Sequence, residues 1–222
     1  MKRSGQKAHV FFDSFEPSKV VSGGASVKTA AGEWYFVLEK GINSNLPYAG
    51  TVLKAPAAGE EQIELVAGDR VFRIDKERFC KTSASVSVEE GTIDVGDDCD
   101  PGATIPDGIV NVTGSLGKFF RYDSETGDFD SVTAEMLNRF FSIVDDDGKG
   151  VYKVDERVNA TAYLLICLNS DAKPGQIENW LFVPAIISSL AINLGNTDAQ
   201  NQDISWSKGE GEAIIYRVPK GA

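Results

Sequence analysis

The residues best suited to catalysis are few in this sequence and do not lie together. There is a single histidine, His9, near the start of the chain. Acid–base and nucleophilic catalysis commonly need a histidine beside a serine or cysteine, with a carboxylate to orient it. No such constellation can be built elsewhere in the chain. We read His9 as an ordinary surface residue, and we expect no catalytic residue and no enzyme activity.

The three cysteines also suggest no site. Cys80, Cys99 and Cys167 are separated by distances that match no zinc-binding pattern. An odd number of cysteines does not indicate a disulfide framework. Cys167 stands within the apolar run 162–168, where we expect it to be buried.

An acidic run at 145–147 is the one candidate for a metal site. Asp145, Asp146 and Asp147 precede Gly148, and Asp155 or Glu156 could add a further ligand. The spacing does not match the calcium loop of an EF-hand, and the run reads better as a solvated acidic loop at a helix end. The glycine pairs at 148–150 and 209–211 lie beside acids, which disfavour phosphate. We therefore expect neither a metal nor a cofactor.

Composition indicates a globular protein with an acidic surface. The 222 residues are 42% hydrophobic and 25% charged, and the net charge is −11. Such a surface repels nucleic-acid phosphate and anionic lipid. The longest apolar stretch, 180–194, contains Pro184 and Asn193 and is too short to span a bilayer. No apolar segment of signal-peptide length follows the basic start, so we expect no membrane association.

Strand patterns dominate the chain. Residues 1–32 read as an extended arm, and 33–222 as a single β-rich domain of roughly ten strands. Compact apolar runs at 34–38, 162–168 and 213–218 favour strands. The clearest alternation lies between Thr82 and Val95, where Val86 and Val88 are expected to face the core.

One segment, about 133–144, predicts a flanking α-helix. Its apolar residues recur at helical spacing, and Ser131 or Thr133 can cap its start. The residues expected to pack against the sheet are Met136, Leu137, Phe140, Phe141 and Val144.

Charge is unevenly distributed along the chain. Between Lys81 and Lys118 there is no basic residue and there are seven acids. This pattern suits a solvated sheet face, and it equally suits a surface that must repel a polyanion. A chain of many strands must also protect its sheet edges, and closure into a ring of copies is one way to do so.

Three stretches resemble the tail tube proteins of tailed bacteriophages and related injection machines. The first is the alternating strand 82–95 with its acidic loop, and the second is Val112-Thr-Gly-Ser-Leu116. The third is the ending, from Ile187 to Leu194 and on through Gly209-Glu-Gly-Glu-Ala-Ile-Ile-Tyr216. The resemblance covers roughly 80–218 and is one of pattern and order.

This resemblance implies a β-sandwich or half-barrel with a flanking helix. Six copies would form a ring, and stacked rings would form a non-enzymatic tube that passes DNA without binding it. The protein would assemble in the host cytoplasm and reside in the virion, with itself and other tail proteins as partners. The arm or the loop 41–50 would bridge rings. Candidate lumen-facing residues are Ser85, Ser87, Glu89, Glu90 and Asp94.

Two other classes remain open at this stage. A head–tail connector or decoration protein would share the acidic, β-rich composition but would not polymerise into long tubes. A ligand-binding β-sandwich would need exposed aromatic side chains gathered on one surface. Trp34, Trp180 and Trp206 are its candidates, and each stands in an apolar context that favours the core or an interface.

Overall fold

The computed structural model describes ten segments of the chain: 9–13, 17–19, 27–74, 81–94, 104–119, 141–143, 152–154, 161–169, 172–193 and 201–220. Within them the protein is all β, with fifteen strands whose pairings, where assigned, are antiparallel. The prediction of a mainly β fold is confirmed, whereas roughly ten strands is too few. Among these residues no helix has the length and hydropathy needed to cross a membrane.

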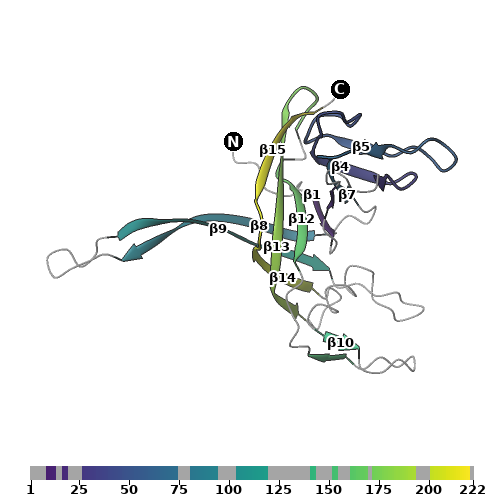
Figure 1. The fold of residues 1–222 in the computed structure, drawn as a ribbon. Helices are drawn as coiled ribbons and strands as arrows, with labels where there is room; N and C mark the ends of the chain where they lie inside the picture. The colour runs from purple at the N-terminus through teal and green to yellow at the C-terminus, as the bar shows by residue number, and fades with distance from the viewer. Residues whose placement is uncertain are drawn as a thin grey trace. The chain divides into compact units, whose positions relative to one another are not determined.

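The strands follow the chain in this order: β1 (His9–Asp13), β2 (Ser18–Lys19), β3 (Val27–Lys28), β4 (Trp34–Glu39), β5 (Val52–Lys54), β6 (Glu64–Leu65), β7 (Arg70–Ile74), β8 (Lys81–Asp94), β9 (Thr104–Phe119), β10 (Phe141–Ile143), β11 (Tyr152–Val154), β12 (Ala162–Cys167), β13 (Ile177–Asn193), β14 (Asn201–Lys208) and β15 (Ile214–Pro219). Figure 1 shows their arrangement.

The chain divides into two compact units. The first unit comprises Met1–Cys80, Ala162–Pro184 and Gly211–Ala222, and the second comprises Lys81–Thr161 and Ala185–Glu210. Strand β13 contributes to both, because residues 177–182 pair with β15 and residues 185–193 pair with β14.

The first unit is a sandwich of two sheets. One is the part of the seven-stranded sheet that contains β1, β12, β15 and the first half of β13, and the other is a four-stranded sheet with the order β2-β7-β4-β5. Large apolar side chains alternate toward the space between them, as strand geometry requires. The core contains Phe11, Phe36, Leu38, Phe72, Ile74, Leu165, Cys167, Trp180 and Phe182. The buried thiol of Cys167 agrees with its predicted place in an apolar run.

Aromatic rings join the two sheets of the first unit. Phe36 of β4 contacts both Trp180 and Tyr216, with ring centroids 5.4 and 5.3 Å apart. The Tyr216 hydroxyl donates a 3.0 Å hydrogen bond to the Leu38 carbonyl. Burial and the nearby Glu39 carboxylate raise the pKa of Tyr216 to about 12, although Arg70 acts in the opposite direction. The tyrosine therefore closes the sandwich as a neutral hydrogen-bond donor.

The outer face of β4 and β7 is also buried. Tyr35, Val37 and Val71 pack there against Leu46, from the connection between β4 and β5, and against Leu65 of β6. Apolar and polar residues therefore do not alternate along β4, because its four central residues are all buried. A strand covered on both faces reads as a continuous apolar run.

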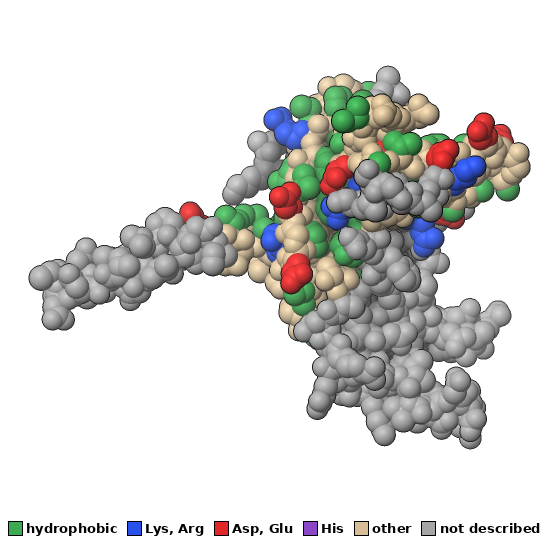
Figure 2. Space-filling model, viewed as in Figure 1, with side chains coloured by type: hydrophobic (Ala, Val, Ile, Leu, Met, Phe, Trp, Pro, Cys, Tyr) green, Lys and Arg blue, Asp and Glu red, His purple; other side chains and the backbone are tan. Residues whose placement is uncertain are grey.

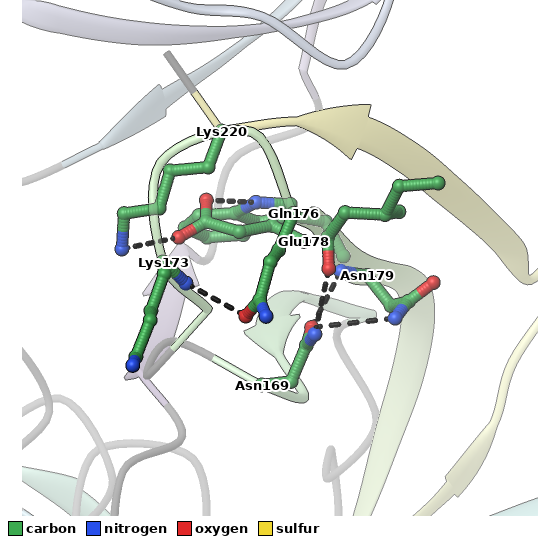
Figure 3. Close-up of polar contacts among 8 residues, drawn as sticks. Asn169, Lys173, Gln176, Glu178, Asn179 and Lys220 are labelled. Atoms are coloured by element: carbon green, nitrogen blue, oxygen red, sulfur yellow. Dashed lines mark hydrogen bonds and ion pairs between the residues drawn. The ribbon is translucent and has the colours of Figure 1, made fainter. Parts of the chain in front are cut away.

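A polar network fixes the turn between β12 and β13 (Figure 3). The Asn169 side-chain carbonyl accepts a 2.6 Å hydrogen bond from the Asn179 backbone N–H, and its amide donates to the Ile177 carbonyl. Glu178 forms an ion pair of 2.9 Å with Lys220 and also accepts a hydrogen bond from the Trp180 indole. These contacts tie the end of β15 to the turn.

The second unit is built around a long hairpin of β8 and β9. Their register runs from Lys81↔Lys118 to Asp94↔Thr104, with irregularities after Lys81 and after Glu90. Strand β14 pairs with β9 over Thr113–Phe119 only. Figure 1 shows the hairpin continuing beyond β14 as a two-stranded ribbon.

The helix predicted over 133–144 is wrong where the structure describes it. Phe141, Ser142 and Ile143 form β10, which pairs with β11. The apolar–polar–apolar order of these three residues is compatible with a strand and with one turn of a helix. Pairing with Tyr152–Val154 makes the segment a strand. Met136, Leu137, Phe140 and Val144 lie outside the described residues.

Candidate functional site

The most distinctive surface of the described chain is one face of the sheet in the second unit. Residues that pair directly in antiparallel strands point to the same side. In the register, Ser85 lies opposite Ser115, which lies opposite Ser205, which lies opposite Ser189. A row of four serines therefore crosses β8, β9, β14 and β13.

Adjacent rows repeat this polar character. Ser87, Thr113 and Ser207 form the next row across three strands, and Glu89 pairs with Asn111 beyond it. We call this surface the polar face. Its members are Ser85, Ser87, Glu89, Asn111, Thr113, Ser115, Ser189, Asp203, Ser205 and Ser207. All are exposed except the partly buried Ser207, and none is basic.

Hydrogen bonds confirm that these side chains share a face. The hydroxyl oxygens of Ser85 and Ser115 lie 2.8 Å apart across β8 and β9. The Ser87 hydroxyl donates a 3.0 Å hydrogen bond to the Glu89 carboxylate two residues along the strand. The surface that results is rich in hydroxyl groups, and its charged members, Glu89 and Asp203, are acidic.

The opposite side of the same strands forms a core. Val112, Leu116, Ile187, Ile204 and Trp206 are buried there. Alternation within each strand therefore places hydroxyl groups on one side and apolar groups on the other. This division fixes which way the polar face points.

Gly114 permits the close packing beneath the polar face. It pairs with Val86 on one side and Trp206 on the other. A Cβ at this position would lie 2.4 Å from Cζ2 of Trp206 and 2.3 Å from the Ser85 carbonyl oxygen. Only glycine lets the Trp206 ring approach β9 this closely, and Trp206 is 1% exposed.

The predicted lumen candidates separate into three groups. Ser85, Ser87 and Glu89 lie on the polar face, as alternation predicts. Glu90 pairs with Val110 and so belongs to the opposite side of the ribbon. Asp94 ends β8 after the irregularity that follows Glu90. Whether any of them faces a lumen stays a prediction.

The expectation that Val88 faces the core is wrong. Its side chain is 64% exposed, whereas that of Val86 is partly buried. Val88 lies where β9 no longer pairs with β14, and its neighbour Val110 is also exposed. Val88 does lie on the same side of β8 as Val86, as predicted. It is exposed because the hairpin has only two strands at this point, and two strands offer too few neighbouring side chains to bury it.

The sequence reading missed the contribution of the other strands. Thr113, Ser115, Ser205 and Ser207 were not among the candidates, although each stands in a short run that alternates with apolar residues. That alternation could have found them. Their placement beside Ser85 and Ser87 depends on strand order, which no local pattern gives.

The other candidate positions fall elsewhere. Trp180 and Trp206 are buried, and Trp34 is 40% exposed in the first unit. His9 lies in β1, where it pairs with Cys167. The acidic run 145–147, with Asp155 and Glu156, lies outside the described residues. Within the part of the chain that the structure describes, no group of three or more His, Cys, Asp or Glu is placed to hold a metal ion.

Comparison with known proteins gives only distant likenesses. No family model matches the chain, and no curated protein matches it. A chain from the solved virion of a native gene transfer agent particle superposes with a TM-score of 0.37 at 12% sequence identity. The superposition covers 63% of this chain and 88% of that chain.

Two further structures resemble the chain to the same degree. A chain from the tail of an empty gene transfer agent particle with C6 symmetry gives a TM-score of 0.38 at 12% identity, with coverage of 63% and 85%. A chain from the sheath–tube complex of an extracellular contractile injection system gives 0.37 at 17%, with coverage of 64% and 84%. Superposition at this level does not assign a function.

Proposed function

We propose that this protein is a non-enzymatic virion structural protein, and specifically a tail tube subunit. Copies assemble into six-membered rings, and the rings stack into a tube through which DNA passes into the host. The observation that carries the proposal is the polar face, which spans four strands of the second unit and contains no basic side chain.

A DNA conduit needs a wall of this kind. Duplex DNA carries about one negative charge per 1.7 Å of its axis, and basic side chains bind it by releasing counterions. A wall of hydroxyl groups with Glu89 and Asp203 remains hydrated and does not retain the polyanion. Short side chains also keep the bore wide, and Gly114 lets the sheet stay tightly packed behind them. The resemblance of 80–218 to tail tube proteins supports the same assignment.

Self-assembly is the first test of this function. Purified protein should form rings and then tubes without nucleic acid as its concentration rises, measured by analytical ultracentrifugation and negative-stain microscopy. Assembly that stops at one ring would favour a head–tail connector. A species that stays monomeric at every concentration, even with other tail proteins present to nucleate it, would overturn the proposal.

A further inference from the structure

The two-stranded ribbon of the second unit exposes apolar side chains on one side. It consists of Val88–Asp94 of β8 and Thr104–Val112 of β9, which lie beyond the residues that pair with β14. Val88 and Val110 are each more than half exposed, and Figure 2 shows hydrophobic side chains at the surface of the described part of the ribbon. A hairpin of two strands is only marginally stable by itself in water. A cover over this side would therefore stabilise the ribbon.

One unpartnered negative charge lies on the same side. Val88 pairs with Val112 and Glu90 pairs with Val110, and directly paired residues of antiparallel strands point to the same side. Glu90 follows Val88 by two residues, so the two side chains leave β8 about 7 Å apart on one side of the strand. Glu90 is exposed and forms no ion pair with a described residue. We call Val88, Val110 and Glu90 the ribbon patch.

The outer side of β15 presents a surface of similar make-up in the first unit. Tyr216 and Val218 pack against the sandwich core, so the alternate residues Ile215 and Arg217 point away from it. Ile177 of β13 lies on the same outer side of this strand pair. Ile215 is 58% exposed and Ile177 is 41% exposed. We call Ile177, Ile215 and Arg217 the β15 patch.

Arg217 gives the β15 patch a net positive charge. It is exposed and forms no ion pair with a described residue. The charges around it cancel in pairs. Lys220 forms its 2.9 Å ion pair with Glu178, and the exposed Lys173 and Glu212, beyond opposite ends of the strand pair, have opposite signs.

We infer that the ribbon patch of one copy docks face to face on the β15 patch of a second copy of this chain. Val88 and Glu90 are two residues apart on one side of β8, and Ile215 and Arg217 are two residues apart on one side of β15. Both separations are about 7 Å, so Val88 contacts Ile215 where Glu90 meets Arg217. The contact removes apolar surface from water and pairs two charges that have no partner within a copy.

The same charges disfavour the docking of two ribbons on each other, because that contact would bring two Glu90 carboxylates together. Docking between two different patches is heterologous, and it repeats from copy to copy until it closes a ring or continues as a stack. The inference rests on the proposed function, because it names a contact through which copies of the tube subunit associate.

Charge reversal tests the pairing of Glu90 with Arg217. Glu90→Arg alone and Arg217→Glu alone should each raise the dissociation constant for self-association about tenfold or more, measured by sedimentation. The double variant restores opposite signs and should recover most of the lost affinity. Arg73→Glu and Glu64→Arg are the matched controls, since they make the same charge changes at exposed positions on β7 and β6 and should leave assembly unchanged. Either single variant that assembles like wild type, or a double variant no better than the worse single, overturns the contact.

Cross-linking between single-cysteine copies tests whether the two patches meet between molecules. Every copy carries Cys80→Ser and Cys99→Ser, so that its one native thiol is the buried Cys167. One version adds Val88→Cys, and the other, lengthened by an affinity tag, adds Ile215→Cys. Facing sheets lie about 10 Å apart, beyond the reach of a disulfide of about 7 Å between Cα atoms, so the probe is a short bismaleimide.

The mixture of the two versions should give a covalent heterodimer, and each version alone should give none. A dimer from either version alone, or no heterodimer from the mixture, overturns the inference. Sedimentation of the wild type under the same conditions separates this result from the proposed function. Wild-type protein that forms rings and tubes while the cross-link fails loses this contact only, whereas wild-type protein that never assembles refutes the proposed function as well.

Discussion

Substitution of Gly114 by alanine tests whether the polar face is fixed from behind by Trp206. The added methyl group would lie 2.4 Å from Cζ2 and 2.6 Å from Cε2 of the indole, and 2.3 Å from the Ser85 carbonyl oxygen. Ordinary contacts of a Cβ begin near 3.4 Å. The ring and the neighbouring strand must therefore each move by about 1 Å in an interior packed as densely as a crystal.

The cost should lie at the upper end of the range for overpacking. Extra methyl groups in a well-packed core typically cost about 1 to 3 kcal/mol. Trp206 is 1% exposed and cannot swing into solvent, and the second obstacle is backbone, which yields less readily than a side chain. We expect about 3 kcal/mol, and in a chain of this size that lowers Tm by about 6 to 12 °C.

Urea denaturation followed by tryptophan fluorescence measures this change, with circular dichroism as a second probe. Thr113→Ala is the matched control, since Thr113 precedes Gly114 on β9 and its side chain is exposed. The control should stay within about 0.5 kcal/mol of the wild type. If Gly114→Ala is equally mild, β9 does not lie against Trp206 as described, and the argument for a rigid polar face fails.

Three further changes have calculable outcomes. Asp69→Ala leaves two backbone N–H groups and the Ser44 hydroxyl without their buried acceptor, so the free energy of unfolding should fall by about 2 to 4 kcal/mol in urea titrations; Ser44→Ala, which removes one of these bonds, should cost clearly less. The raised pKa of Tyr216 means that its stabilising effect is complete below the unfolded-state value of 10.0 and is lost as pH rises toward about 12. Tyr216→Phe should therefore be less stable than wild type at pH 8, with a gap that narrows above pH 10, and a constant gap would contradict the assigned cause. Changing Glu89 and Asp94 together to lysine should preserve tube assembly but slow DNA ejection, most strongly at low salt where screening is weakest; ejection at the normal rate would refute a lumen position for these residues.

Much of the strand content could be predicted from local pattern. Run 34–38 is rich in aromatic residues and run 162–167 is apolar and includes Tyr163 and Ile166, and both form strands. The alternation between Thr82 and Val95 correctly placed Ser85, Ser87 and Glu89 on one face. These features succeed because side-chain parity in a strand is fixed by backbone geometry and needs no knowledge of distant partners.

The failures arise where a partner decides the outcome. Phe141–Ile143 fits a helix turn or a strand equally well, and pairing with β11 resolves it. Val88 has the parity of a core residue, yet it is exposed because β14 does not extend beside it. The residues of either segment contain no information about which strand will pair beside it or where that strand ends. The sequence alone therefore could not have corrected these two predictions.

The polar face shows the same limit for function. Its serines come from four strands, and Ser85 and Ser205 are 120 positions apart in the sequence; within each strand most of them are ordinary exposed positions. Only the register that sets Ser85, Ser115, Ser205 and Ser189 in one row turns them into a continuous surface without basic residues. Any one of these serines can be replaced by alanine with little effect on a conduit, because hydration and the absence of positive charge belong to the whole face. A single lysine at the same position adds the one property that the face lacks, so charge insertion, not hydroxyl removal, distinguishes a conduit wall from a merely solvated surface.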